Sequence, residues 1–196
     1  MQDAFLLKRA SGGDTEAFIQ LVSPYEKKLY FWCLGTLKNP EDAKDCVQET
    51  LIKAFRGIGQ FRSDASLSTW LYRIAYRCCV DMLRKSRPID ALPDADADAM
   101  QLTDRSPQPY EALEAKERLR LLNEAISRLP DEHRLPLLLF VQGEDYATIS
   151  EVLSVKLGTV KSRISRAREH LKEILAQDME LYGLSDVEKH EGRHSS

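Results

Sequence analysis

The sequence predicts an all-α protein in which an extended acidic linker joins two small helical domains. Three observations predict this fold class. Only nine of the 196 residues are Gly and eight are Pro, whereas 43% are hydrophobic, a composition that permits substantial cores. Apolar residues recur at helical spacing in stretches near both ends of the chain. Between these stretches lies one acidic segment that contains prolines and has no sustained helical periodicity.

These patterns set the expected domain boundaries. The first domain should cover residues 1–87, the linker 88–110 and the second domain 111–176. Within Ile89–Glu111 there are six acidic residues against one Arg, a net charge of −5, which favours an extended linker. Residues 177–196 form a polar, acidic tail that we expect to be partly disordered.

At least three helices are expected in the first domain. Apolar residues at a period close to 3.6 predict the first helix over Asp14–Gly35. In the second, Asn39 can cap the amino terminus and Pro40 can occupy the first turn, with the helix continuing to Phe55. The third should run over Ser66–Lys85.

A helical wheel of the third helix separates a core-facing stripe from a basic aromatic face. The residues expected in the core are Leu67, Leu71, Ile74, Ala75, Cys78 and Met82. The opposite side carries Tyr72, Arg73, Tyr76, Arg77 and Arg84, with Trp70 at the edge. Rings beside guanidinium groups suit single-stranded nucleic acid, because rings stack on unpaired bases and cations hold phosphates. Alternatively, the tyrosines fold back over the helix as ordinary amphipathic surface residues.

The second domain has a helix-turn-helix pattern. An amphipathic helix over 111–129 precedes a second one for which Asp131 is a possible cap. Asp145 can then cap a short helix, a turn follows at Ser154–Gly158, and Thr159 can cap a longer basic helix. Two helices joined in this way are typical of DNA-binding proteins that insert the second helix into the major groove.

Local charge supports nucleic-acid binding although the formal net charge is −3. Gln48–Pro88 carries eight cations and three acids, and Lys156–Lys172 carries six cations and one acid, so each has a net charge of +5. The residues expected to reach bases or nearby phosphates are Thr159, Lys161, Ser162, Ser165 and Arg166. Arg163 and Arg168 lie closer to the core-facing boundary and suit phosphate contacts or internal ion pairs.

Other classes of protein are disfavoured. The four cysteines contain no CxxC pair and the four histidines are scattered, so no zinc template fits and we expect no metal. No convergent acid, base or nucleophile set points to an enzyme, and no cofactor is expected. No stretch approaches the roughly 20 apolar residues of a membrane span, so we expect a cytoplasmic protein without membrane insertion.

Three motifs, in this order, carry a family resemblance. They are "EDAKDCVQETLIKAF", "FRSDASLSTWLYRIAYR" and "LGTVKSRISRAREHL". Over about Leu6–Leu175 the chain resembles bacterial extracytoplasmic-function (ECF) sigma factors of the sigma-70 family. The resemblance implies a transcription initiation factor that binds core RNA polymerase, directs it to promoters and assists melting, with no catalysis of its own. It also implies restraint by an anti-sigma factor.

The resemblance implies three binding surfaces. The surface for core polymerase, whose beta-prime clamp and beta flap are the expected partners, comprises Asp45, Gln48, Glu49 and Ile52. Minus-ten recognition, with capture of a base flipped from single-stranded DNA, would use Phe61, Arg62, Ser63, Asp64, Ser66, Trp70, Tyr72, Arg73, Tyr76 and Arg77. The double-stranded minus-thirty-five element would be read by Thr159, Lys161, Ser162, Arg163, Ser165, Arg166 and Arg168. From the residues alone, the polar cluster at 45–49 could equally be a solvated helix face.

Two rival functions remain open at this level. One is a free-standing helix-turn-helix regulator, which would bind duplex DNA without polymerase and would leave the face at 61–77 unexplained. The other is a redox or signalling protein that uses Cys78 and Cys79, which the wheel places in the core and at its margin. Relative to the family pattern, Tyr76 and Arg77 are departures, and Ser154 stands in the turn where Gly is common.

Overall fold

The fold was analysed in a computed structural model, which describes residues 2–61, 65–86 and 111–181. Within these ranges the secondary structure is helical, as the sequence predicts. The elements in chain order are α1 (Gln2–Ser11), α2 (Thr15–Leu37), α3 (Pro40–Gly57), the 3-10 helix η1 (Ile58–Gln60), α4 (Leu67–Ser86), α5 (Glu111–Ser127), α6 (Asp131–Val141), α7 (Tyr146–Leu153) and α8 (Leu157–Leu181). The expected linker at 88–110 lies outside the described residues.

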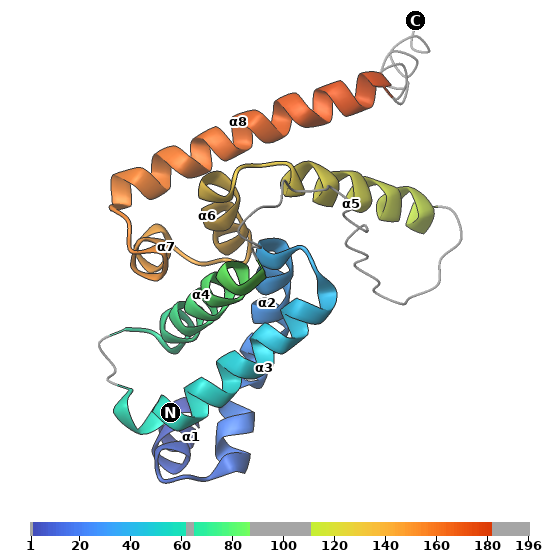
Figure 1. The fold of residues 1–196 in the computed structure, drawn as a ribbon. Helices are drawn as coiled ribbons and strands as arrows, with labels where there is room; N and C mark the ends of the chain where they lie inside the picture. Colours follow the sequence, from blue (N-terminus) through green and yellow to red (C-terminus); the bar gives the residue numbers. More distant parts are fainter. Residues whose placement is uncertain (1, 62–64, 87–110, 182–196) are drawn as a thin grey trace, which may run out of the picture.

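Helices α2, α3 and α4 form the bundle of the first half, and α1 packs against α2 and η1 (Figure 1). The expected cap of α3 is confirmed, since the Asn39 side chain accepts hydrogen bonds from the backbone N–H groups of Glu41 and Asp42 at 2.9 and 3.1 Å. Helix α1 was not predicted from the sequence, although Leu6 and Ala10 are buried against the bundle.

The second half has the predicted helix-turn-helix, formed by α7 and α8. Asp145 caps α7 by accepting the Thr148 N–H at 2.7 Å, and Ser154 turns the chain in the left-handed region at φ 54°. Two cap predictions are wrong. Helix α8 begins at Leu157, so Thr159 lies inside its first turns, and α6 begins at Asp131 with Pro130 in the cap position.

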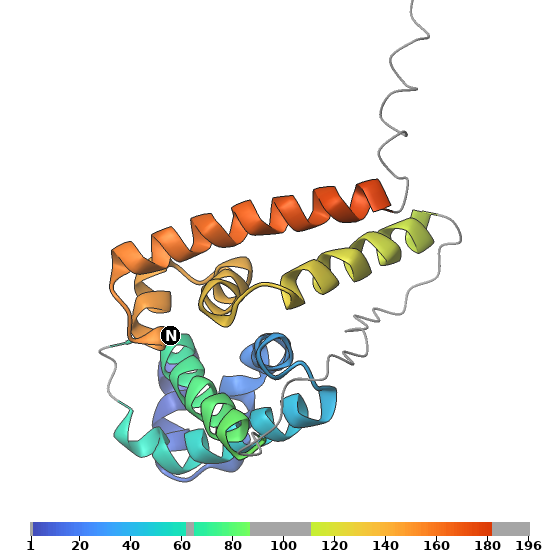
Figure 2. The same cartoon turned by 45° about the horizontal axis from the view of Figure 1, so that its top comes forward.

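The carboxy-terminal boundary also differs from the expectation. Helix α8 continues through Leu181 and does not stop near residue 176. Its inner face packs on α6, α5 and α7, and Figure 2 shows it running along the outer side of the second half. The first five residues of the predicted tail are therefore helical, and 182–196 lie outside the described residues. No helix in the described ranges is long and apolar enough to cross a membrane.

The two halves pack directly on each other. Helix α4 contacts α7 and helix α2 contacts α6, as both views show (Figures 1 and 2). Lys28 and Gln142 bond reciprocally, because the Gln142 side chain donates to the Lys28 carbonyl at 3.0 Å and the Lys28 ammonium donates to the Gln142 carbonyl at 3.3 Å. This packing buries residues on faces of α2 and α4 that a two-domain chain would leave exposed.

Candidate functional site

The outer face of α3 carries the four residues expected to bind polymerase. Asp45, Gln48 and Glu49 are exposed, and the side chain of Ile52 has 45% of its surface exposed despite being apolar. Asp45 and Gln48 line a groove of about 730 Å³ between α2 and α3. The opposite face of α3 is buried through Ala43, Cys46, Val47, Thr50 and Ala54. The outer face of α3 thus combines carboxylates, an amide and one apolar side chain, a mixture that is compatible with binding a protein partner.

The start of α4 is fixed by a small polar and aromatic cluster. Ser66 accepts the Thr69 N–H at 3.1 Å, and its hydroxyl bonds that of Thr69 at 2.7 Å. The rings of Phe61 and Trp70 lie 5.2 Å apart, and Trp70 covers Gly57. These contacts place Phe61 and Ser66, the two ends of the loop between η1 and α4, beside the Phe61–Trp70 ring pair. Arg62, Ser63 and Asp64 lie outside the described residues.

The prediction that Tyr72 is exposed is wrong. Tyr72 is only 1% exposed, its ring meets Trp32 edge to face at 6.0 Å, and its hydroxyl donates to the Gln142 side chain at 3.3 Å. Burial raises the pKa of Tyr72 above its usual value. The wheel assumed one buried face, whereas α4 is covered on one side by α2 and α3 and on another by α7. Tyr72 therefore belongs to the junction between the halves.

The neighbours of Tyr72 are partly covered in the same way. The ring of Tyr76 is half-buried 6.3 Å from Trp32. Arg73 pairs with Glu151 of α7 at 3.5 Å and also donates to the Glu151 carbonyl at 3.3 Å. Arg77 is exposed. Of the cations on this face, Arg73 is thus held by the second half while Arg77 is open to solvent.

Helix α8 presents most of its predicted DNA-reading residues to solvent. The exposed members are Lys161, Ser162, Ser165, Arg166 and Arg168, whereas Thr159 is half-buried. Arg163 is partly buried and pairs with Glu132 at 3.3 Å, in keeping with the internal ion pair that the sequence suggested. This polar face is contiguous along the helix because the core residues Val160, Ile164 and Ala167 point the other way.

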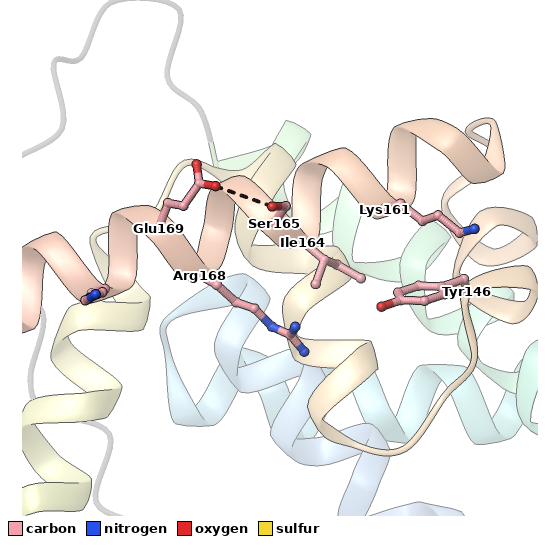
Figure 3. Close-up of a pocket in the computed structure, with 7 residues that line it drawn as sticks. Tyr146, Lys161, Ile164, Ser165, Arg168 and Glu169 are labelled. Carbon is pink, nitrogen blue, oxygen red and sulfur yellow. Dashed lines mark hydrogen bonds between the residues drawn. The ribbon is translucent and has the colours of Figure 1, made fainter.

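Phe140 and Tyr146, two aromatic residues that were not among the predicted site residues, pack beside this basic face. The rings of Phe140 and Tyr146 stack at 5.4 Å; the Arg168 guanidinium lies 4.8 Å from the Phe140 ring centre and the Lys161 ammonium 5.9 Å from that of Tyr146. Tyr146, Lys161 and Arg168 line a pocket of about 320 Å³. Figure 3 shows these side chains and the hydrogen bond that the Ser165 hydroxyl donates to Glu169. The sequence signal was Tyr146 at the first position of the first helix of the helix-turn-helix.

Comparison with known proteins identifies both halves. The family model for sigma-70 region 2 matches residues 21–89, and that for sigma-70 region 4 matches residues 119–171. The chain is 33% identical over 177 residues to the ECF RNA polymerase sigma factor SigW of Bacillus subtilis, covering 86% of this chain and 94% of SigW. The chain belongs to the ECF sigma factors of the sigma-70 family. It is therefore an alternative sigma factor, which binds core RNA polymerase and directs it to promoters.

Further sigma factors show a comparable extent of similarity. SigM of Mycobacterium tuberculosis is 36% identical over 174 residues, covering 88% of this chain and 84% of SigM. The sigma-H factor of Pseudomonas aeruginosa is 35% identical over 184 residues, covering 89% of this chain and 94% of the sigma-H factor. The sigma-70 fold is confirmed by CnrH, solved with the cytosolic domain of CnrY, at a TM-score of 0.67, 23% identity and coverage of 91% and 99%. It is also confirmed by RpoE of Bartonella quintana, solved with the anti-sigma factor NepR. The TM-score is 0.63 and the identity 23%, and the match covers 83% of this chain and 98% of RpoE.

Proposed function

We propose that the outer face of α3 is the surface by which this sigma factor docks on the beta-prime clamp of polymerase. The observation that carries this proposal is that Asp45, Gln48 and Glu49 share one exposed face of α3 beside the α2–α3 groove, with Ile52 on the next turn. Carboxylates on such a surface can pair with basic groups of a partner, while the apolar side chain becomes desolvated on binding. Since α3 is anchored by its cap and its buried face, the surface is presented rigidly.

A charge-reversal pair tests this docking surface. In Asp45→Arg with Glu49→Arg, two exposed acids become cations, so association with core polymerase should be lost while the far-UV circular dichroism stays unchanged. A matched control is Glu16→Arg with Asp81→Arg, which changes the net charge equally at exposed positions on α2 and α4. Gel filtration of each variant with core polymerase provides the measurement. Equal co-elution of both double variants would contradict the proposal.

For the minus-ten element, the start of α4 offers a base-contacting wall. Phe61, Ser66 and Trp70 stand at the ends of the loop, and Tyr76 and Arg77 continue along the same helix. An aromatic pair of this kind can stack on an extruded base, and nearby arginines can hold its phosphates. Tyr72 takes no direct part, because it is buried beneath this face.

The exposed face of α8 is proposed to read the minus-thirty-five element. Lys161, Ser162 and Ser165 lie near its amino-terminal end, where a recognition helix reaches base edges. Arg166 and Arg168 follow on the next turn and suit phosphate contacts. Specific run-off transcripts should require both this protein and core polymerase. A protein that footprints promoter duplex alone but yields no transcript with core would instead be a free-standing regulator.

The proposed setting is the cytoplasm, where polymerase and DNA are found, and the protein would initiate transcription without catalysing a reaction itself. Control by an anti-sigma factor is also proposed, because two chains of the same fold were solved with protein partners, one of them named an anti-sigma factor. Such a partner should compete with core polymerase for the α3 surface. Competition in gel filtration, with loss of both complexes in the α3 double variant, would support this form of control.

A further inference from the structure

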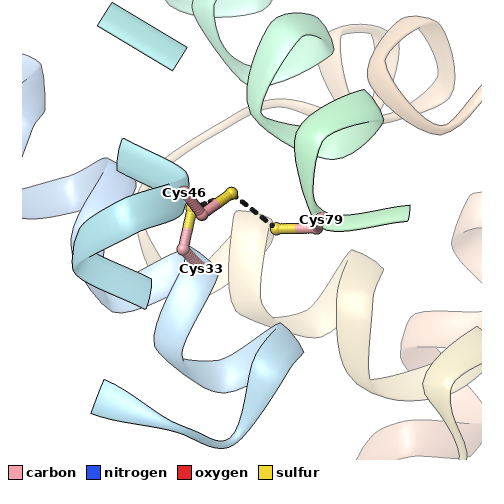
Figure 4. Close-up of side chains that lie close together, drawn as sticks. All are labelled: Cys33, Cys46 and Cys79. Atoms are coloured by element: carbon pink, nitrogen blue, oxygen red, sulfur yellow. Dashed lines mark hydrogen bonds between the residues drawn. The ribbon is translucent and has the colours of Figure 1, made fainter. Parts of the chain in front are cut away.

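Three cysteines from three different helices meet inside the first half. Cys33 of α2, Cys46 of α3 and Cys79 of α4 are each fully buried, and all four cysteines of the chain are free thiols. The sulfur atoms of Cys33 and Cys46 lie 3.7 Å apart, and those of Cys46 and Cys79 lie 3.4 Å apart (Figure 4). All three sulfurs lie within 4.8 Å of one another. The thiols therefore converge on one point at the centre of the α2–α3–α4 bundle.

This grouping differs from the vicinal pair that the sequence suggested. Cys79 is buried rather than marginal, because its sulfur points into the bundle toward Cys46 of α3 and Cys33 of α2. The Cys78 sulfur lies 3.5 Å from the Lys53 ammonium, outside the group of three. Adjacent side chains on a helix point about 100° apart, so Cys78 and Cys79 lie in different surroundings.

The spacing of the three sulfurs matches metal coordination better than a disulfide. With metal–sulfur bonds of about 2.3 Å, three thiolates in a plane around one ion would place their sulfurs about 4.0 Å apart. The two printed separations, 3.4 and 3.7 Å, are somewhat shorter than this value, and the third sulfur pair lies within 4.8 Å, so small adjustments of the side chains would seat one ion. A disulfide would require about 2.05 Å between two sulfurs and would leave the third thiol unused.

We propose that Cys33, Cys46 and Cys79 form a binding site for one thiophilic metal ion of the Cu(I) or Zn(II) class. Thiolate ligands select these soft ions over Mg²⁺ or Ca²⁺, which prefer oxygen. Three thiolates suffice for a three-coordinate Cu(I), whereas Zn(II) prefers a fourth ligand. The site would be closed, since each donor is inaccessible to solvent.

Binding requires that the thiols lose their protons. For each cysteine a sulfur–hydrogen bond breaks, a sulfur–metal bond forms and the proton passes to solvent, with no change in oxidation state.

Metal binding should also stabilise the helices that carry the docking surface. The ion would link α2, α3 and α4 at their common core, while Asp45 and Gln48 lie on the outer face of α3 next to Cys46 and Val47. A ligand that binds only the folded state raises stability by mass action. The proposal concerns this core site and does not depend on the polymerase surface, so failure of either test leaves the other intact.

The experiment uses the reduced full-length protein under anaerobic conditions, with Cu(I) and Zn(II) each added in the presence of a competing chelator. We expect about one equivalent of Cu(I) to survive gel filtration and to raise the thermal midpoint, with weaker retention of Zn(II). Cys33→Ser and Cys79→Ser should lose both effects. The matched control Cys78→Ser, which keeps all three ligands, should retain them. Stronger retention of Zn(II) would still support the site and would identify the ion.

A measurement on the unaltered protein covers the case in which the serine variants do not fold. X-ray absorption of the metal-loaded chain should show three sulfur neighbours at about 2.3 Å. Fewer than three sulfur neighbours, equal metal retention by the Cys33→Ser and Cys79→Ser proteins, or no retention of either ion would overturn the proposal. So would a Cys46–Cys79 disulfide that forms in air while neither metal binds.

Discussion

Arg134 links two helices of the second half from a buried position. Only 2% of its side chain is exposed, yet its guanidinium donates to the Leu129 and Ser127 carbonyls at 3.1 and 3.3 Å and pairs with Asp131 at 2.7 Å. These carbonyls lie at the end of α5, where a helix leaves acceptors without intrahelical partners. Arg134 thus supplies donors to the end of α5 from the first turn of α6.

Replacing this arginine should be costly. In Arg134→Met the carbonyls lose their donor in a buried setting, so the free energy of unfolding should fall by about 2–4 kcal/mol. The exposed partner offers the control, because Asp131 is 66% exposed and Asp131→Asn should cost less than about 1 kcal/mol. Urea denaturation followed by circular dichroism measures both changes. Similar losses in the two variants would mean that the ion pair, not the capping, dominates.

The cap of α7 makes a second, pH-dependent contribution. The Thr148 N–H donates to Asp145 and lowers the pKa of its carboxyl below the usual value. Because the folded pKa is depressed, the stabilisation is present above the unfolded pKa and is lost as the pH falls through the folded pKa. Asp145→Ala should therefore cost about 1 kcal/mol near neutral pH, and the difference from the unaltered protein should shrink below about pH 4.

Asn at the same position separates capping from charge. Asp145→Asn keeps an acceptor for the Thr148 N–H but cannot titrate, so its stability should stay near that of the unaltered protein at neutral pH. Thermal unfolding of the three proteins across the acidic range measures the effect. If the stability difference between the unaltered protein and the Asp145→Ala variant grew toward acid pH, the predicted loss of the cap's contribution at low pH would be contradicted.

Features that depend on neighbouring residues in the sequence could be predicted, whereas features that depend on distant residues could not. Asn39 and Asp145 could be predicted as caps because a cap acts within three residues. The start of α8 could not be placed from Thr159, because a good capping residue also fits inside a first turn. Tyr72 was misplaced for another reason: its partner Gln142 lies 70 residues away, and no local pattern reports such a contact.

Gly35 sets how closely α2 approaches α6. A Cβ at this position would lie 2.5 Å from the Leu138 Cδ1, so only glycine permits the present packing without a shift. Gly35→Leu should separate the two helices and increase the radius of gyration in small-angle scattering. Gly35→Ala is the control, because Leu138 can turn away and alanine gains up to about 1 kcal/mol of helix propensity. An unchanged radius of gyration in Gly35→Leu would show that α2 and α6 can repack.

For the molecule as a whole, the sequence predicted the parts but not their closed arrangement. The family motifs located α3, α4 and α8 correctly, since each motif is contiguous. The contact of α7 with α4, including Arg73 and Glu151, joins surfaces from opposite sides of the linker. In this arrangement α4 is partly covered while the outer faces of α3 and α8 stay open. The proposed binding faces on α3 and α8 are therefore accessible in this arrangement, whereas much of α4 is not.

The charge distribution predicts how duplex binding should respond to salt. The exposed cations of α8 neutralise phosphates and release counterions, so affinity should fall linearly on a double logarithmic plot against salt concentration. If Arg166 makes one phosphate contact, Arg166→Ala should reduce the slope of this plot by about 1 for every promoter sequence and leave association with core polymerase unchanged. Fluorescence anisotropy with minus-thirty-five duplexes, using the holoenzyme, provides the measurement. As a control, replacing Lys85, an exposed cation on α4, in Lys85→Ala should leave the slope unchanged. If Arg166→Ala lost affinity only for duplexes with one particular base at one position, Arg166 would read that base and not a phosphate.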